Sequence, residues 1–287
     1  MKLPCAALLP PLFRLLVLGA ALLTGCATTP TTDPATATAL DTILAGQHRV
    51  REHRARDPYR HPKETLLFFG IRQDMTVIEV WPGAGWYTEI LAPLLRDQGQ
   101  LYVALLDPAS GEYAKNTVET YRSKLQLRPD LYGKVIPTTL AAPPPKAEQA
   151  KIEIAPAGSA DFVLTVRNLH NWMMFGWERD ALAAMHAALK PGGVLGVVAH
   201  RGNPTLPQDP KAASGYVRED YAIRVIEAAG FRLVARSEIN ANPKDTKDYD
   251  KGVWTLPPGF ADGDEQRYGQ IGESDRFTLK FVKVATP

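Results

Sequence analysis

A glycine-containing segment that follows an apolar strand is the part of this chain best suited to chemistry. The predicted strand Thr76–Val80 runs into Gly83 and Gly85, and residues 86–95 then show helical spacing. Glycines let a backbone turn sharply and let a ligand approach without a Cβ clash, and a helix start adds unpaired N–H groups. The pattern therefore predicts a site for a nucleotide-like cofactor at this turn, although a tight connection without a ligand would use the same residues.

Two acidic residues flank the predicted turn. Glu79 stands near the end of its strand, and Asp107 directly follows the next predicted strand, residues 101–106. Because parallel strands bring their carboxyl ends to one edge of a sheet, Asp107 could there accept hydrogen bonds from both hydroxyls of a ribose.

Two histidines are the candidates for a general base. His170 lies in the loop after the predicted strand 161–166, and His200 lies near the end of the strand 194–198. The unperturbed pKa of histidine, about 6.5, suits proton transfer near neutrality. Either residue could instead hold its loop by hydrogen bonds, and the sequence leaves both interpretations open.

The elements that must position these residues alternate between strands and helices. Near-continuous apolar strands separated by helices predict an α/β fold with a doubly wound, mostly parallel, seven-stranded sheet. The site of such a fold lies at the carboxyl ends of the strands. The predicted strands are 76–80, 101–106, 135–139, 161–166, 194–198, 231–236 and 277–284.

The residues around the turn also resemble a known superfamily. VIEVWPGAG and LKPGGVL resemble the first and the strand-five motifs of class I S-adenosylmethionine-dependent methyltransferases. The pieces WPGAGWYTEILAP, RNLHNW, AAGFRLVARSEI and GESDRFTLKF are similar to a group of bacterial methyltransferases that are often exported. The resemblance covers about residues 47–285.

The resemblance implies a Rossmann-like methyltransferase fold with an antiparallel last strand, and S-adenosylmethionine as the cofactor. By position, it implies that Glu79 lies near the methionine end of the cofactor and that Gly83 and Gly85 skirt it. It assigns the ribose to Asp107, and it places Asn168, just past the fourth strand, beside the methionine side.

The sequence departs from the family pattern in two places. Trp81 stands where the commonest pattern has its first glycine, and Pro82 follows it, which predicts a different route for the turn. No clear Asp follows the third strand, where many members contact the adenine amine. An indole from Trp81 or Trp86 that filled the crevice would exclude the cofactor.

The N-terminus has the pattern of an export signal. Lys2 and Arg14 precede the apolar run Leu15–Leu23, which as a helix would rise only about 14 Å, against a hydrocarbon core of about 30 Å. The run ends in Leu-Thr-Gly-Cys, which resembles a bacterial lipobox with Cys26 as the lipidated residue. A plain secretory signal is the alternative.

This organisation predicts a lipoprotein signal over residues 1–25 and a flexible tether over 26–39. A methyltransferase-like domain follows over 40–287, in which the poorly periodic segment 237–276 forms a cap insertion. Ala27 is not the usual inner-membrane retention residue, so the resemblance implies a periplasm-facing lipoprotein of the outer membrane.

Charge and cysteine content exclude several classes. The chain has 33 Lys and Arg against 31 Asp and Glu, and residues 1–25 contain two bases and no acid, so the remainder is balanced. A nucleic-acid binder needs surplus positive charge. The two cysteines, Cys5 and Cys26, fall in or just after the signal, so we expect neither a disulfide nor a metal site.

An arginine-rich stretch, residues 48–62, precedes the predicted sheet. It contains Arg49, Arg51, Arg54, Arg56 and Arg60 with few acids. We interpret it as a solvent-facing stretch, since local charge runs are usually solvated. The alternative is an anion-facing patch over the mouth of the site.

Two functions remain open at this stage. The first is methyl transfer to an unknown small-molecule or envelope acceptor. The second is a non-catalytic methyltransferase-like module that binds another ligand or an envelope partner, because a charged cytoplasmic cofactor does not cross a bilayer unaided. The sequence identifies neither the acceptor nor the oligomeric state.

Overall fold

The computed structural model describes residues 1, 33–141 and 152–284. The signal, Cys26 and nearly all of the proline-rich segment 141–150 lie outside them. Every helix and strand that the structure describes lies within the unit Thr32–Pro287.

Four helices precede the sheet, and the first of them shortens the predicted tether. Asp33 caps helix α1 by accepting hydrogen bonds from the backbone N–H groups of Ala35 and Thr36. Residues 34–39, predicted as part of the tether, are therefore helical, and Thr36 is buried. The four helices are α1 (Pro34–Leu44), α2 (Arg51–Arg54), α3 (Asp57–Arg60) and α4 (Pro62–Phe69).

The sheet has eight strands in the order β4-β3-β2-β1-β5-β6-β8-β7. Strands β3, β2, β1, β5 and β6 are parallel, and β8 is antiparallel to both of its neighbours. The seven predicted strands and the antiparallel last strand are confirmed, and the two-residue β4 is an addition at the edge. The strands are β1 (Thr76–Val80), β2 (Gln100–Leu105), β3 (Ile136–Leu140), β4 (Ile152–Glu153), β5 (Ala160–Val166), β6 (Leu189–His200), β7 (Phe231–Ser237) and β8 (Arg276–Lys283).

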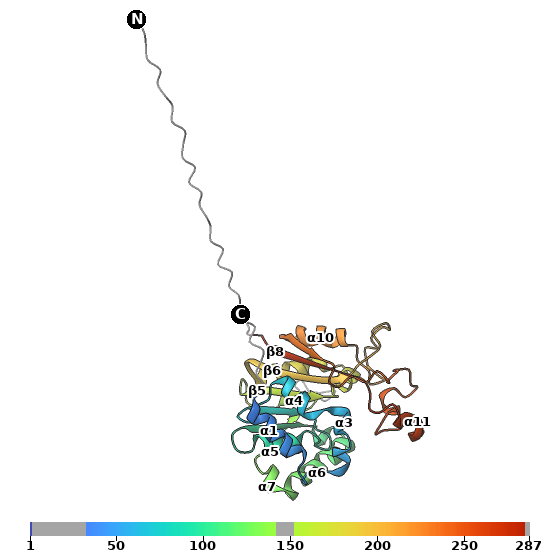
Figure 1. Ribbon diagram of the computed structural model, residues 1–287, viewed down its shortest axis with the longest axis horizontal. Coiled ribbons are helices and arrows are strands. Elements are labelled where there is room, and N and C mark those ends of the chain that lie inside the picture. Colours follow the sequence, from blue (N-terminus) through green and yellow to red (C-terminus); the bar gives the residue numbers. More distant parts are fainter. Residues whose placement is uncertain (2–32, 142–151, 285–287) are drawn as a thin grey trace. The chain divides into compact units, whose positions relative to one another are not determined.

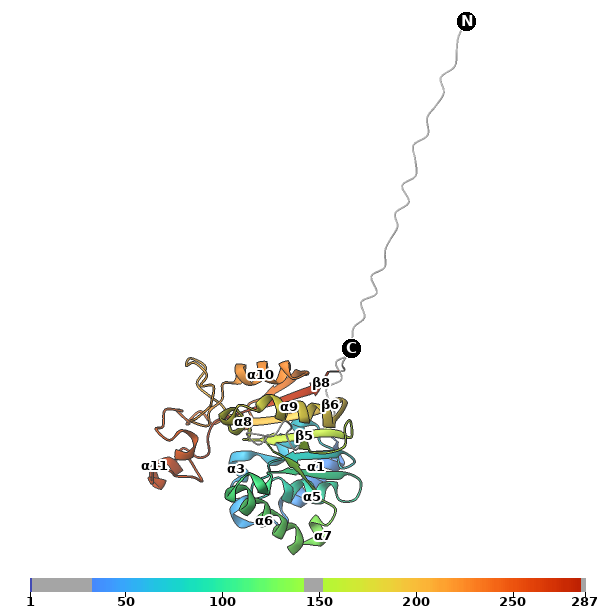
Figure 2. The same cartoon turned by 180° about the vertical axis from the view of Figure 1, so that it is seen from behind.

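Helices cover both faces of this sheet (Figures 1 and 2). No helix among the described residues is both long and apolar enough to span a bilayer. The remaining helices are α5 (Thr88–Leu95), η1 (Pro108–Ser110), α6 (Glu112–Leu127), α7 (Pro129–Tyr132), α8 (Leu169–Phe175), α9 (Glu178–Ala188), α10 (Glu219–Ala228), η2 (Gly252–Thr255) and α11 (Glu265–Gly269).

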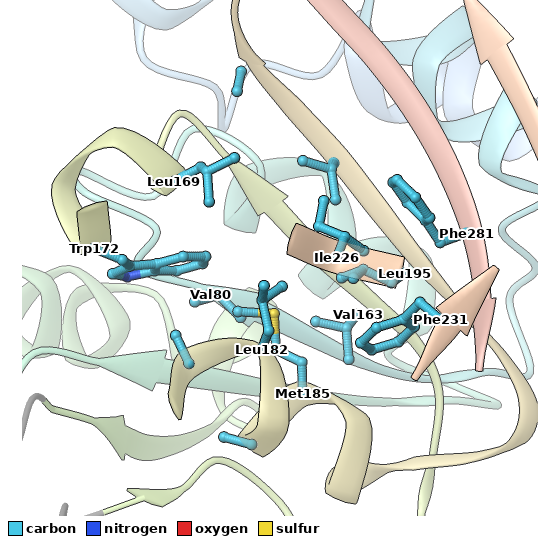
Figure 3. Close-up of a cluster of buried hydrophobic side chains, with 14 of the residues drawn as sticks. Val80, Val163, Leu169, Trp172, Leu182, Met185, Leu195, Ile226, Phe231 and Phe281 are labelled. Atoms are coloured by element: carbon cyan, nitrogen blue, oxygen red, sulfur yellow. The ribbon is translucent and has the colours of Figure 1, made fainter. Parts of the chain in front are cut away.

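Two apolar clusters, one on each face, hold these layers together. Helices α1, α4, α5 and α6 pack on one face, where Val77 of β1 is buried among them. Helices α8, α9 and α10 pack on the other face against Ile78 and Val80 (Figure 3). Adjacent residues of β1 thus face opposite layers, which is the alternation that a strand imposes.

The motif LKPGGVL forms the first part of strand β6. Strand β6 begins at Leu189, opposite Ala160, and resumes at Val194, opposite Phe162. The intervening residues form an irregularity inside β6, since four residues here oppose one on β5.

The register of the central strands brings the candidate site together. Val80, the last residue of β1, lies opposite Ala104 on β2 and Thr165 on β5. The segments that follow β1, β2 and β5 therefore leave the sheet at the same edge.

Gly196 provides a test of this packing. A Cβ there would lie 2.9 Å from the Phe162 ring and 3.0 Å from the Phe69 ring, so we expect Gly196→Ala to lower the free energy of unfolding by about 1–3 kcal/mol. Gly269→Ala, where a Cβ meets nothing within 4 Å, should change it by less than about 0.5 kcal/mol. Urea denaturation measures both, and equal midpoints for the two variants would contradict this account.

Candidate functional site

The turn after β1 is built from three alternate residues with left-handed backbones. Trp81, Gly83 and Gly85 have φ of 47°, 57° and 79°. The sequence predicts a different route at Trp81, yet its backbone has the conformation that glycine adopts most readily. Its N–H donates to the Ala104 carbonyl at 2.9 Å, which ties the start of the turn to β2.

The two glycines of the turn serve different purposes. A Cβ at Gly83 would meet nothing within 4 Å, so one side of the turn is open there. A Cβ at Gly85 would lie 3.1 Å from the Tyr121 ring and 3.3 Å from the Lys124 ammonium. Gly83 is thus the place where a ligand can approach the backbone, whereas Gly85 permits packing against α6.

A buried ion pair holds the turn from behind. The Lys124 ammonium donates to the Ala84 carbonyl at 2.8 Å and to Glu89 Oε1 at 2.6 Å. Burial alone would raise the pKa of Glu89, but His53 and Lys124 outweigh it and hold that pKa below its usual value. Sequence reasoning missed this network, because its members are far apart along the chain and belong to no local motif.

Glu79 lies inside the protein beneath the same turn. Its carboxyl is buried and accepts a hydrogen bond from the Thr88 hydroxyl at 2.6 Å, and that hydroxyl also lies 2.8 Å from the Tyr121 hydroxyl. Burial raises the pKa of Glu79 to about 7, although the Thr88 hydrogen bond works against the rise. Glu79 therefore links β1 to the first turn of α5.

Asp107 follows β2 at the same edge and is half-buried. It caps η1, with Oδ1 accepting from the Ala109 N–H at 2.9 Å. No described residue donates to its Oδ2, so one carboxylate oxygen is available to a ligand.

Asn168 joins the ends of β1 and β5. Its Nδ2 donates to the Val80 carbonyl at 2.8 Å and to Thr165 Oγ1 at 3.2 Å, and the residue is buried. The structure thus brings Gly83, Asn168 and Asp107 to one edge, with Asn168 bound to protein groups.

The two tryptophans near the turn lie in different places. The Trp81 indole N–H donates to the Leu140 carbonyl at the end of β3 at 2.8 Å, and the ring packs 5.4 Å from that of Trp177. Trp81 therefore reaches from β1 past the end of β2, to the end of β3. The Trp86 indole instead donates to the His53 carbonyl at 2.8 Å and lies under the Arg60 guanidinium.

The residues present fit S-adenosylmethionine in part. The open side of Gly83 and the free oxygen of Asp107 suit the backbone and sugar contacts that the family resemblance implies. The end of β3, where the resemblance implies the adenine amine, is engaged by the Trp81 indole. An adenine amine at this place would share the Leu140 carbonyl with the indole.

The candidate bases His170 and His200 lie side by side, with ring centroids 5.4 Å apart. His200 Nε2 accepts from Arg167 Nε at 3.3 Å, so His200 is neutral and its Nδ1 carries the proton donated to Ser274. Burial, with Arg167 nearby, lowers the pKa of His170 to about 4 and that of His200 well below its usual value.

The segment predicted to be a cap touches this histidine pair. Ser274 bonds His200, and the Trp254 ring lies 6.0 Å from that of His170. Residues from the 237–276 segment thus line the same edge of the sheet as the strand ends.

The arginine-rich stretch is only partly solvent-facing. Arg51 and Arg54 are exposed as predicted, but Arg49 is 2% and Arg60 6% exposed, so the interpretation is wrong for these two. Arg49 pairs with Asp57, and Arg60 pairs with Glu273 at 3.0 Å. Contacts with a segment more than 200 residues away bury Arg60, and no local pattern reports them.

Among residues 33–141 and 152–284, no three His, Cys, Asp or Glu side chains gather closely enough to hold a metal ion.

Comparison with known proteins bears on the fold. No protein-family model and no curated protein matches the sequence. Among solved structures, a SAM-dependent methyltransferase from Aquifex aeolicus matches 88% of this chain and 99% of its own, with a TM-score of 0.51 and 18% identity. The [4+2]-cyclase SpnF matches 88% of this chain and 93% of its own, with a TM-score of 0.55 and 15% identity.

The fold is that of the class I methyltransferases. At these identities the likeness concerns the fold alone, and one of the two neighbours named above is a cyclase. Chemistry on this fold has to be argued from the site.

Glu79 gives the site a pH-dependent test. Its raised pKa means that the folded state binds more protons than the unfolded state between about pH 4.5 and 7, so its contribution to stability falls as pH rises through that window. The slope is at most about 1.4 kcal/mol per pH unit. Glu79→Gln has no proton to lose, so the stability of this variant relative to wild type should increase from pH 5 to 7 and level off above.

Urea denaturation at several pH values measures this difference. Asp161→Asn is the control, because the pKa of Asp161 is lowered and its contribution should not vary above about pH 5. A difference between Glu79→Gln and wild type that stays constant from pH 5 to 7 would contradict the raised pKa.

Proposed function

We propose that this protein is an S-adenosylmethionine-dependent methyltransferase whose site lies at the carboxyl ends of β1, β2 and β5. The observation that carries the proposal is the open side of Gly83 next to a half-buried Asp107 with a free oxygen, on the class I fold. The cofactor, when bound, supplies an electrophilic methyl group on a sulfonium.

The chain's own residues would position the reacting groups. Gly83 lets the ligand approach the backbone, and Asp107 Oδ2 accepts from the ribose. Asn168 keeps the ends of β1 and β5 together beneath them. His170 is neutral at pH 7 and would accept a proton from the acceptor. Because its pKa is about 4, it suits acceptors that release their proton readily.

The acceptor and the compartment belong to the same proposal. A lipid at Cys26 would hold the domain on the periplasmic side of an envelope membrane, the outer membrane by the identity of Ala27. The acceptor would then be a small molecule or an envelope component within reach of that membrane.

A second candidate function is favoured by one observation. The Trp81 indole is bonded to the Leu140 carbonyl, where the resemblance implies the adenine. This arrangement supports a non-catalytic methyltransferase-like module, in which the indole takes the place of the cofactor's base and the protein binds another ligand or an envelope partner.

Calorimetry with S-adenosylhomocysteine on the full chain in detergent separates the two candidates. The methyltransferase should bind it saturably, and Asp107→Asn should weaken binding at least about 10-fold, because a charge-assisted hydrogen bond is lost while the Ala109 cap is kept. Gly83→Ala should also weaken binding by placing a methyl group on the open side of the turn.

Gly158→Ala is the matched control. Gly158 has a similar φ of 64° and a Cβ there meets nothing within 4 Å, but it precedes β5, at the opposite end of that strand. Absence of heat with wild type would refute the methyltransferase. Binding that appears only in Trp81→Gly would support the non-catalytic module.

The lipid anchor has its own test. Expression with a radiolabelled fatty acid should label the wild-type protein and place it in the membrane fraction. Cys26→Ala should abolish the label, because no other cysteine follows the signal. Label retained by Cys26→Ala would exclude lipidation at this position.

A further inference from the structure

Three arginines contact a single carboxylate, Glu273, at the edge of the sheet described above, and a fourth arginine lies near them. Glu273 accepts hydrogen bonds from Arg56 Nε at 2.5 Å and from Arg60 Nε at 3.0 Å, and it forms an ion pair with Arg276 Nη1 at 2.9 Å. Arg167 lies beside them, because its Nε donates to His200, and His200 in turn bonds Ser274, the residue that follows Glu273. One negative charge thus faces three positive charges, and a fourth lies nearby.

Three of these arginines have a structural explanation. Arg56 and Arg276 join α2–α3 to the start of β8 through Glu273, and Arg276 also donates to the Tyr59 carbonyl at 3.0 Å. Arg60 donates to Glu273 through its Nε. Neither Arg60 Nη2 nor the Arg167 guanidinium has an acidic hydrogen-bond partner among the described residues.

Arg60 Nη2 is an unpaired buried donor. Arg60 is 6% exposed, its guanidinium lies 4.9 Å from the centroid of the Trp86 ring, and its Nη2 has no hydrogen-bond partner in the described part of the chain. A buried guanidinium with an unsatisfied N–H is costly, and an anion that accepted this N–H would remove the cost.

Arg167 is held in place by a strained backbone. Its φ is 65°, which costs a residue other than glycine about 1–3 kcal/mol. Its N–H continues the β5–β6 ladder by donating to the Val198 carbonyl at 2.7 Å, and its Nε donates to neutral His200. The strained backbone thus positions the Arg167 guanidinium, whose hydrogen-bond partner, His200, carries no charge.

We propose that Arg60 and Arg167 bind an oxyanion, the carboxylate or phosphate group of a ligand, beside the His170–His200 pair. Guanidinium groups match planar carboxylates and phosphates through paired N–H donors. Burial lowers the pKa of Arg60 to about 10 and that of Arg167 to about 9, and repulsion between the arginines lowers both further. A bound anion would stabilise the charged form of both guanidiniums.

The position of this site points to the acceptor. Arg167 follows β5, on the side of the Gly83 turn away from Asp107, and the Trp254 ring stands next to His170. The anion site itself does not depend on methyl transfer. Its assignment to the acceptor rests on the proposed function, and it would make the acceptor an anionic molecule.

Titration of the full chain with inorganic phosphate, and separately with acetate, at constant ionic strength tests the site. We expect saturable binding of at least one of the two, and the tighter of them identifies the ligand group. Arg167→Gln should weaken binding at least about 10-fold. Glu273→Gln should strengthen it, because the competing carboxylate loses its charge, and a purely structural cluster would not give these opposite signs.

Arg218→Gln is the matched control, because Arg218 is already paired with Asp220 and should leave binding unchanged. Circular dichroism of each variant checks that it is folded. No saturable binding of either anion, or equal affinity in wild type and Arg167→Gln, would overturn the site.

Competition with S-adenosylhomocysteine then separates the two possible sources of the anionic group. Phosphate or acetate binding that persists at saturating S-adenosylhomocysteine supports an anionic acceptor. Displacement of phosphate or acetate by S-adenosylhomocysteine would overturn the assignment to the acceptor. It would show that the arginines bind the carboxylate of the cofactor itself. If S-adenosylhomocysteine does not bind at all, the methyltransferase proposal fails while the anion titration remains decisive.

Discussion

The candidate site depends on the left-handed turn that ends β1. Three alternate residues, Trp81, Gly83 and Gly85, have positive φ, and only two of them are glycines. A tryptophan in this conformation costs about 1–3 kcal/mol. The Trp81 indole offsets that cost by packing against Trp177 and bonding the Leu140 carbonyl. Trp81 thus holds the turn in place with the same side chain that occupies the end of β3.

Electrostatics divide the edge of the sheet into two regions. Behind the turn, Lys124 and Glu89 are paired and neutralise each other. Beyond β5, three arginines share the single carboxylate of Glu273, and the nearby histidines are neutral because burial and Arg167 oppose a further positive charge. A ligand that bridged these regions would meet open backbone at Gly83 and positive charge at Arg167.

The same scaffold can support different reactions, as two of its structural neighbours, a methyltransferase and a cyclase, illustrate. What distinguishes one reaction from another is the set of side chains at the strand ends and in the segment that covers them. Here that segment contributes Trp254 beside His170 of α8, Ser274 bonded to His200 at the end of β6, and Glu273 paired with Arg60 of the arginine stretch. Substrate choice would therefore be decided by this segment together with Arg167.

Sequence by itself determined the strands, the Gly83–Gly85 turn and the class of fold. Hydrophobic periodicity and glycine placement act over a few residues, so they can be interpreted locally. It also predicted that Asp107 and Asn168 lie at one edge of the sheet, because the carboxyl ends of parallel strands meet there. It failed at residues 34–39, where the Asp33 cap outweighed a composition typical of a linker.

Tertiary structure alone decided the burial of Arg60, the direction of the Trp81 indole and the neutral state of both histidines. Each of these depends on a partner far along the chain: Glu273 for Arg60, Leu140 for Trp81 and Arg167 for His200. The charge and exposure of a side chain depend on what covers it, and no local pattern specifies which distant segment that will be.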